Sequence, residues 1–236
     1  KDKKKISALN KIDLASSALT EKWLDYFHQK ENTAVAVNSI SGKGISQLIN
    51  KIHNNYQSKN KLLLKKGREK SPIRVMIIGV TNVGKSALIN AITGTNKTRT
   101  GNRPGVTRGK QWIKVDSKIR LLDTPGILWP KFDDEEVGYK LALTGAIDDD
   151  IFDVELAAYK LIKYIIKIEP EKLENFYNID IDIREHPYDI LPLIGKKRGC
   201  LMSGGKINRN RTSKLLIHDF RKGKLGKITL ETPDIG

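Results

Sequence analysis

Cysteine is almost absent from the sequence, because Cys200 is the only one among 236 residues. A lone thiol can form neither an internal disulfide nor a cysteine-based zinc site, so disulfide-rich and zinc-stabilised domain classes are excluded. We expect Cys200 to be an ordinary small core residue. The sequence also lacks an apolar run of about 18 residues and the pattern of a signal peptide. It therefore predicts a cytoplasmic protein that has no membrane partner.

Acidic residues are also few in comparison with basic ones. The chain has 27 acidic and 43 basic residues, which gives a formal net charge of +16. A protein this basic usually contacts a polyanion, and nucleic acid is the favoured one. Hydrophobic residues make up 39% of the chain, which allows a packed core, and 236 residues suffice for one large or two small domains.

Apolar periodicity divides the chain into a mixed part and a helical part. The predicted strands are residues 6–9, 33–39, 73–79, 111–115 and 119–122. The predicted helices are residues 19–30, 45–57, 86–93, 135–144, 154–168, 171–177, 188–194 and 207–222. Thr20 is a candidate cap of the first helix, and residues 58–71 are predicted to form a lysine-rich connector. Strands that alternate with helices indicate a mostly parallel sheet.

A glycine-rich loop, GVTNVGKS at residues 79–86, follows the apolar run IRVMIIG and precedes a predicted helix. The continuous apolar run is typical of a strand that is buried on both faces. The loop matches the pattern GxxxxGKS, in which backbone N–H groups and a helix N-terminus surround a phosphate. We expect Lys85 to reach the β- and γ-phosphates and Ser86 to bind Mg²⁺. The nucleotide-contacting residues predicted in this segment are Asn82, Val83, Gly84, Lys85, Ser86 and Ala87.

A second motif, NKID, begins at Asn10 and also follows an apolar run. It resembles the guanine-reading motif NKxD, in which Asp13 would accept the N1–H and N2–H₂ groups of guanine. Lys11 would cover the ring, and Asn10 would brace the loops. As an isolated match, the same residues also fit a helix start that is capped by Asp13. Downstream, VNSISGKGI resembles the loop that contacts guanine O6, which places Asn38 and Ser39 at the base; the alternative is a plain strand-to-helix turn.

The third motif, DTPG, begins at Asp123, so the order along the chain is NKID, phosphate loop, DTPG. In ordinary GTPases the phosphate loop comes first and NKxD follows DxxG. The chain therefore resembles a circularly permuted GTPase, and the combined pattern is similar to the ribosome biogenesis GTPase A family, whose members assist assembly of the large ribosomal subunit in bacteria. The resemblance implies an α/β fold, with a circularly permuted Ras-like P-loop GTPase domain at residues 1–131 and an all-helical C-terminal domain at residues 132–236. In the family a strand and a helix precede the NKxD strand, so we also expect an N-terminal stretch before residue 1.

The resemblance assigns further roles around the γ-phosphate. Asp123 would hold Mg²⁺ through a water molecule, and Gly126 would donate its N–H group to the γ-phosphate. In the segment NRPGVTRG, Thr107 resembles the switch residue that binds Mg²⁺ when GTP orders the loop, and a surface turn is the alternative. Ile127 stands where Ras-like proteins have the glutamine that orients water, which matches a hydrophobic substitution of the family. Catalysis would then depend on Lys85, Thr107 and Gly126, with a water-positioning residue from elsewhere and slow intrinsic hydrolysis.

Asn82 has two interpretations. In related GTPases an asparagine at this position helps to bind K⁺, which offsets charge that an arginine finger would otherwise offset. The alternative is an asparagine that hydrogen-bonds its own loop. The sequence leaves both open.

Basic residues concentrate near the C-terminus, where residues 195–227 contain one acidic residue, Asp219. This density favours contact with a polyanion over a solvated charged face. The family resemblance implies that the polyanion is the rRNA of a large ribosomal subunit precursor. The predicted RNA-binding residues are Lys196, Lys197, Arg198, Lys206, Arg209, Arg211, Lys214, Arg221 and Lys222. We expect GTP and GDP as ligands and a monomeric chain.

Two other functions stay open at this point. One is an RNA-binding module that uses nucleotide only as a structural ligand, which Ile127 allows. The other is a different permuted ribosome-assembly GTPase, such as the small-subunit type with an OB-fold and a zinc site, against which the single cysteine argues.

Overall fold

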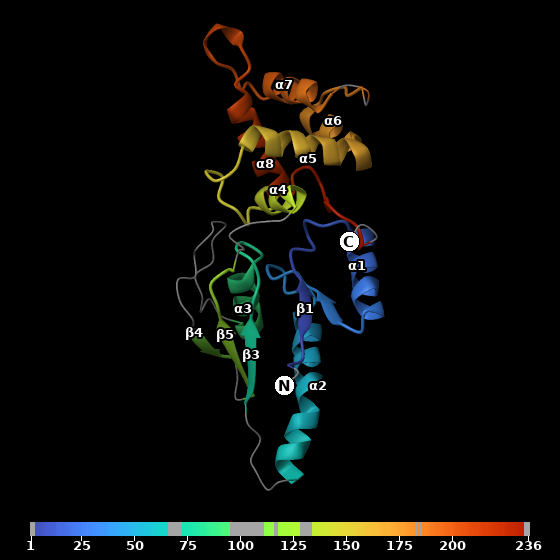
Figure 1. Ribbon diagram of the computed structural model, residues 1–236, viewed down its shortest axis with the longest axis vertical. Coiled ribbons are helices and arrows are strands. Elements are labelled where there is room, and N and C mark those ends of the chain that lie inside the picture. The colour runs from blue at the N-terminus through green and yellow to red at the C-terminus, as the bar shows by residue number, and fades with distance from the viewer. Residues whose placement is uncertain are drawn as a thin grey trace. The chain divides into compact units, whose positions relative to one another are not determined.

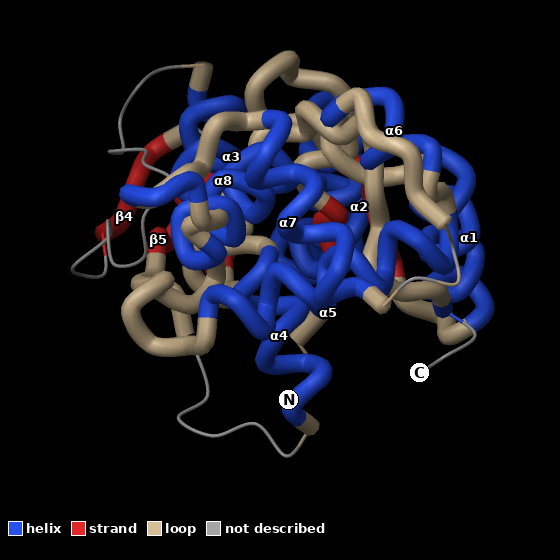
Figure 2. The backbone as a smooth tube through the Cα atoms, turned by 90° about the horizontal axis from the view of Figure 1, so that it is seen from above, coloured by secondary structure: helices blue, strands red, loops and turns tan. Residues whose placement is uncertain are grey.

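The computed structural model describes residues 3–65, 72–94, 111–115, 118–127, 134–182, 184 and 186–233. The chain divides into two compact units, one of Lys1–Leu128 with Glu231–Gly236 and one of Trp129–Leu230. The named strands of the described residues belong to the first unit, whereas the second is built from helices (Figure 1). Figure 2 colours the helices blue and the strands red. Each unit has its own apolar core, and the two are described separately.

The first unit begins with a parallel strand pair. β1 (Ile6–Leu9) lies beside β2 (Thr33–Ala36), with Ile6 opposite Thr33, and α1 (Ser17–Gln29) connects them. The cap predicted for α1 was wrong, because Ser16 caps the helix by accepting from the N–H of Leu19. Thr20 lies inside the first turn instead and donates its hydroxyl to the carbonyl of Ser16 at 2.8 Å.

A second sheet holds three strands in the order β3-β5-β4. β3 (Ile73–Ile77) runs parallel to β5 (Ile119–Asp123), and β4 (Gln111–Lys114) runs antiparallel to β5, which confirms the strand pair predicted from the sequence. The register places Ile77 opposite Asp123. The segments that follow β3 and β5 therefore leave the sheet side by side, and these segments are the phosphate loop and DTPG.

The prediction that β3 is buried on both faces was wrong. Ile73, Val75 and Ile77 face the core, but Met76 is 57% exposed and Arg74 is exposed beside it. The alternation arises because α3 (Lys85–Thr93) packs on one face of the sheet only, through its buried Leu88, Ile89 and Ile92. Arg74 interrupts the apolar run, and because alternate side chains of a strand share a face, it marks the face of Met76 as the exposed one.

The two sheets of the first unit share one apolar core. Val35 and Val37, at and just beyond β2, belong to the same buried cluster as Ile73 of β3 and Ile119 of β5. α2 (Ile45–Lys65) contributes its apolar stripe to this cluster and contacts both β1 and α3. Within the described residues, β1 pairs with β2 and β3 pairs with β5, and no ladder joins the two sheets. α2 also extends to Lys65, so the predicted connector at 58–71 begins as helix.

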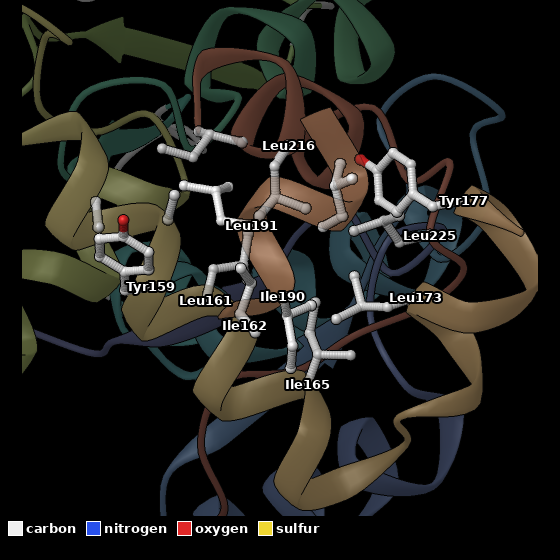
Figure 3. Close-up of a cluster of buried hydrophobic side chains, with 14 of the residues drawn as sticks. Tyr159, Leu161, Ile162, Ile165, Leu173, Tyr177, Ile190, Leu191, Leu216 and Leu225 are labelled. Carbon is white, nitrogen blue, oxygen red and sulfur yellow. The ribbon is translucent and has the colours of Figure 1, made fainter. Parts of the chain in front are cut away.

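The second unit is a helical bundle around α5 (Val154–Ile168). α4 (Glu135–Leu143), α6 (Glu171–Tyr177), α7 (Pro187–Lys197) and α8 (Arg209–Arg221) all contact α5. Figure 3 shows Leu161, Ile162 and Ile165 of α5 pointing into a cluster with residues of α6, α7 and α8. In the described part of the chain, no helix combines the length and the apolar character needed to cross a lipid bilayer.

One buried polar group is held inside this bundle. Asp219 of α8 is 5% exposed and accepts hydrogen bonds from the hydroxyl of Tyr177 at 3.1 Å and from the ammonium of Lys224 at 2.8 Å. Burial and the neighbouring carboxylate raise the pKa of Tyr177, so its hydroxyl stays a donor. The only acidic residue of the basic segment is therefore part of the fold.

α7 and α8 approach closely at Gly195. A Cβ atom at this position would lie 2.7 Å from Oγ1 of Thr212 and 2.8 Å from Cγ2 of Ile207. Neither neighbour can move freely, because the hydroxyl of Thr212 donates to the carbonyl of Asn208 and Ile207 is bridged to Leu201. The absence of a side chain at Gly195 therefore sets the distance between the two helices.

We predict that Gly195→Ala destabilises the second unit by about 1–3 kcal/mol, the usual cost of forcing an extra carbon into a packed site. Helix propensity acts in the opposite direction, because alanine is favoured over glycine by about 1 kcal/mol in a helix. The urea midpoint of unfolding, followed by circular dichroism, measures the balance. Lys196→Ala changes an exposed neighbour in the same helix and serves as the control. An unchanged or higher midpoint for Gly195→Ala would show that the overlap is relieved without cost.

Candidate functional site

The phosphate loop lies between β3 and α3. Gly84 is the N-cap of α3 and has φ +91°, a left-handed conformation that favours glycine. Because Gly84 has no side chain, no capping side chain accepts hydrogen bonds from the first N–H groups of α3. N–H groups at a helix N-terminus attract anions through their partial positive charge. The segment therefore has the backbone geometry of an anion-binding loop.

Lys85 folds back over this loop. Its ammonium donates to the carbonyl of Gly79 at 3.0 Å and to the carbonyl of Val80 at 2.7 Å. Burial lowers the pKa of Lys85 from its ordinary value, and the carboxylate of Asp123 partly opposes that shift. The lysine thus lies between the first half of the loop and the acidic end of β5, where a phosphate group would meet its charge.

DTPG packs directly on the phosphate loop. Asp123 is 2% exposed at the end of β5, and the Thr124 hydroxyl donates to the carbonyl of Ile77 at 2.7 Å. The Ile127 N–H donates to the carbonyl of Gly79 at 3.2 Å. A Cβ at Gly126 would lie 2.8 Å from both Cα and N of Thr81, so only glycine allows the two loops to approach this closely. The sequence reasoning missed the roles of Thr124 and Thr81, although Thr124 lies inside the DTPG motif.

NKID contacts the other side of the same loop. The Asn10 amide donates to the carbonyl of Val83 at 3.0 Å, and the Lys11 ammonium donates to the carbonyl of Asn82 at 2.6 Å. A Cβ at Gly84 would collide with the amide nitrogen of Asn10. Two motifs that are far apart in the sequence are therefore joined by hydrogen bonds from side chains to backbone. The structure brings the NKID, phosphate-loop and DTPG segments together.

Asn10 also binds the loop after β2. Its Oδ1 atom accepts from the N–H of Ser39 at 3.2 Å and from the hydroxyl of Ser39 at 2.8 Å. Asn38 behaves differently, because its side chain accepts from the N–H groups of Ile40 and Ser41 and so stabilises its own turn. Asn10 thus bridges the phosphate loop and the Ser39 loop, which leaves the exposed Asp13 at the outer end of the NKID segment.

Two oxygen-bearing residues lie next to Lys85. Ser86 follows it in the first turn of α3, and the carboxylate of Asp123 at the end of β5 interacts electrostatically with its ammonium. Hydroxyl and carboxylate oxygens are hard ligands of the kind that Mg²⁺ prefers. Ala87 lies in the same helical turn, and Ile127 is 60% exposed. The predicted switch residue Thr107 lies outside the described residues.

The basic residues predicted to contact RNA belong to the second unit and fall into two groups. Three arginines bind other parts of this unit. Arg198 donates to the carbonyl of Phe176, Arg209 donates to the hydroxyl of Tyr159, and Arg221 binds Asp149 and the carbonyls of Leu143 and Ala142. The other six residues have exposed side chains, namely Lys196, Lys197, Lys206, Arg211, Lys214 and Lys222.

Comparison with known proteins agrees with this geometry. The sequence model of a protein family described as 50S ribosome-binding GTPase matches residues 74–186, which begin in β3. The ribosome biogenesis GTPase A of Bacillus cereus is 43% identical over 98% of this chain and 78% of its own length. The protein of the same name from Bacillus pumilus is 43% identical over 99% of this chain and 82% of its own length.

Two solved structures have a similar fold. The GDP-bound structure of TM YlqF superposes with a TM-score of 0.65 at 25% identity, over 97% of this chain and 83% of that one. The GNP-bound YlqF from T. maritima superposes with a TM-score of 0.61 at 26% identity, over 97% and 82%. The order of the motifs, their contacts in one loop cluster and the near full-length similarity to the two Bacillus proteins lead to one conclusion. The chain belongs to the ribosome biogenesis GTPase A family.

Proposed function

We propose that this chain, a GTP hydrolase of ribosome biogenesis, binds a precursor of the large ribosomal subunit through rRNA while it holds GTP and leaves the particle after hydrolysis. The observation that carries the proposal is the contact of NKID and DTPG with one phosphate loop. This arrangement joins a base-reading group to a phosphate-binding group, as one nucleotide requires. The 50S ribosome-binding description of the matching family supports the large subunit as the partner.

The guanine base would be selected at Asp13. This carboxylate can accept the N1–H and N2–H₂ groups of guanine, whereas adenine presents no such pair of donors. Asn10 fixes the position of the segment through Val83 and Ser39, so Asp13 is held on a braced loop. Lys11 adds a second bond to the phosphate loop, which keeps base and phosphate sites at a set separation.

The phosphates would be held by the loop at residues 79–86. N–H groups at the start of α3 and the ammonium of Lys85 meet the negative charge, and the close packing of Gly126 on Thr81 brings the DTPG backbone beside the same loop. Mg²⁺ would be held by Ser86, by Asp123 through a water molecule and, in the GTP state, by Thr107. When bound, the metal ion offsets charge on the phosphate oxygens.

Ile127 limits the intrinsic rate. Its side chain cannot accept a hydrogen bond from an attacking water molecule, and it is largely exposed beside the phosphate loop. The chain therefore binds GTP without the glutamine that orients water in Ras-like proteins. We propose that the ribosomal particle supplies or completes the water-positioning group, so that hydrolysis occurs after docking.

The first prediction concerns the base. Asp13→Asn should lower GTP affinity about 10- to 100-fold, because one good bidentate pair contributes about 1–3 kcal/mol to discrimination. The same variant should gain affinity for xanthosine triphosphate, whose O2 atom can accept from the new amide. Equilibrium titration with fluorescent nucleotides measures both. Asp25→Asn removes the same charge from the exposed face of α1 and is the control. Unchanged GTP affinity of Asp13→Asn would remove Asp13 from the base site.

The second prediction concerns turnover. We expect slow GTP hydrolysis by the isolated chain and a higher rate with purified large subunits, because docking completes the site. Small subunits and free rRNA should stimulate much less when added at the same concentration. Steady-state release of phosphate is the measurement. Stimulation by small subunits alone would contradict the proposed partner, and a rapid rate without any particle would contradict the role given to Ile127.

The third prediction concerns the monovalent cation. Asn82 has φ 55°, a conformation that asparagine tolerates in turns, and its carbonyl accepts from Lys11. These contacts describe the backbone of Asn82, and the K⁺ role of its side chain stays a prediction. With that role, GTP turnover is faster in KCl than in NaCl at equal ionic strength, and Asn82→Ala abolishes the difference. Equal rates of the unchanged chain in both salts would exclude the K⁺ role and leave Asn82 as a structural residue of the phosphate loop.

A further inference from the structure

A short hairpin joins α7 to α8 and extends beyond the helices that hold it (Figure 1). We call residues 199–208 the α7–α8 hairpin. Leu201 is bridged to Ile207, and the N–H of Met202 donates to the carbonyl of Lys206 at 2.8 Å. Residues 201–205 form the tip, in which the chain turns at Gly204 and Gly205, both with positive φ. The hairpin is therefore a defined element with a small, tightly turned end.

Both ends of the hairpin are fixed to the second unit. The N–H of Cys200 donates to the carbonyl of Gly195 at 2.8 Å, and Asn208 N–H donates to the carbonyl of Cys200 at 2.8 Å. Cys200 is fully buried, and Asn208 caps α8 by accepting from the N–H of Arg211. Substitutions at the tip therefore leave these anchors in place, which makes the exposed part of the hairpin suitable for mutational tests.

The tip presents apolar side chains to solvent. Leu201 is 45% exposed and Met202 is 49% exposed, and the two are adjacent in the chain. Basic side chains surround them in the sequence and at the ends of both helices. Lys196 and Lys197 end α7, Lys206 lies in the hairpin, and Arg211 and Lys214 lie in the first turns of α8, all exposed. Such a surface fits a polyanion that also exposes apolar groups, because the basic side chains can bind its charges while the tip contacts its apolar parts.

We propose that Leu201 and Met202 contact unpaired nucleobases of the RNA whose phosphates bind the surrounding lysines and arginines. This inference rests on the proposed function and specifies which part of the RNA is recognised. Paired RNA presents its phosphates outward and hides the faces of its bases, whereas loops and bulges expose base faces to side chains. Leucine and methionine are among the apolar side chains that DNA-binding proteins insert between base steps, so both can pack against the face of a base.

An anionic lipid surface is the other polyanion with apolar surface. Stable membrane attachment needs more buried apolar area than two side chains provide. The membership of the chain in a ribosome biogenesis family also favours RNA. We therefore assign the tip to RNA, and vesicle binding becomes one of the outcomes that the experiment distinguishes.

The experiment separates apolar from ionic contacts through their salt dependence. Binding of the full chain is measured over a range of KCl concentrations with three probes: large-subunit rRNA, a fully paired RNA duplex and heparin. Binding to phosphatidylserine vesicles is measured separately, by co-sedimentation. The Leu201→Ser, Met202→Ser double variant should lose about tenfold in rRNA affinity at every salt concentration, because base contacts release no counterions. Its log–log salt slope should match that of the unchanged chain, and its affinity for duplex and heparin should be unaltered.

Two control variants complete the design. Lys206→Gln lies in the same hairpin and should lower the salt slope by about 0.7–0.9 for all three probes, as expected for one lost phosphate contact. Ile151→Ser removes an apolar side chain that is 74% exposed elsewhere in the second unit and should change nothing. Urea unfolding of each variant should give the midpoint of the unchanged chain, because these side chains lie outside the core.

Three outcomes would overturn the inference. The double variant would bind rRNA as tightly as the unchanged chain, or it would lose affinity equally for heparin and duplex, or it would lose binding to phosphatidylserine vesicles and keep rRNA binding. If the unchanged chain binds rRNA no better than heparin, the proposed RNA partner fails as well. If only the inference about base contacts is wrong, the chain still prefers rRNA and Lys206→Gln still lowers the salt slope. The failure of this inference is therefore distinguishable from the failure of the proposed function.

Discussion

The candidate nucleotide site depends on the side-chain amide of Asn10. Its nitrogen donates to the phosphate loop at Val83, and its oxygen accepts twice from Ser39, so one side chain fixes three loops. The bond requires a glycine at position 84, because any side chain there would occupy the place of the amide. Asn10 and Gly84 therefore form one structural requirement, although they belong to motifs on different sheets. The permuted order of the motifs does not affect it, because hydrogen bonds depend on position in space.

Much of the site could be predicted from the sequence, for a physical reason. Phosphate binding needs backbone N–H groups in a fixed arrangement, and few sequences other than GxxxxGKS provide one, so the loop is recognisable from its residues alone. Helices with strong apolar periodicity were also predictable, and α5 has the bounds that the periodicity indicated. The interpretation of Asn10 as a brace matches the contacts of its amide in the structure.

Other features depend on tertiary contacts that a linear pattern does not contain. The residue that caps α1 is Ser16 and not Thr20, because the chain direction before the helix decides which hydroxyl faces the free N–H groups. The exposed face of β3 is a different case, because the sequence did indicate it: Arg74 lies two residues from Met76 and therefore on the same face. The contacts of Arg209 and Arg221 also depend on packing. Their partners Tyr159 and Asp149 are distant in sequence.

The contrast between arginine and lysine in the second unit follows the same logic. A guanidinium has several donors in a fixed plane, so Arg221 can bind a carboxylate and two backbone carbonyls at once. The lysines predicted to contact RNA have compact, strongly hydrated charges and exposed side chains, whereas Lys224 of the same segment binds Asp219. Some basic residues of this unit therefore stabilise the fold, and others have exposed charges that can contact a ligand. A count of basic residues overestimates the second group.

The division of the first unit into two sheets has a thermodynamic consequence. Besides their common core, the sheets are connected by bonds between loops at the edge where the base and phosphate groups meet. A ligand that touches both loops adds its own binding free energy to that connection, by an amount that grows with the logarithm of its concentration. The stability of this unit therefore depends on how much guanine nucleotide is present, and not only on the contacts within the chain.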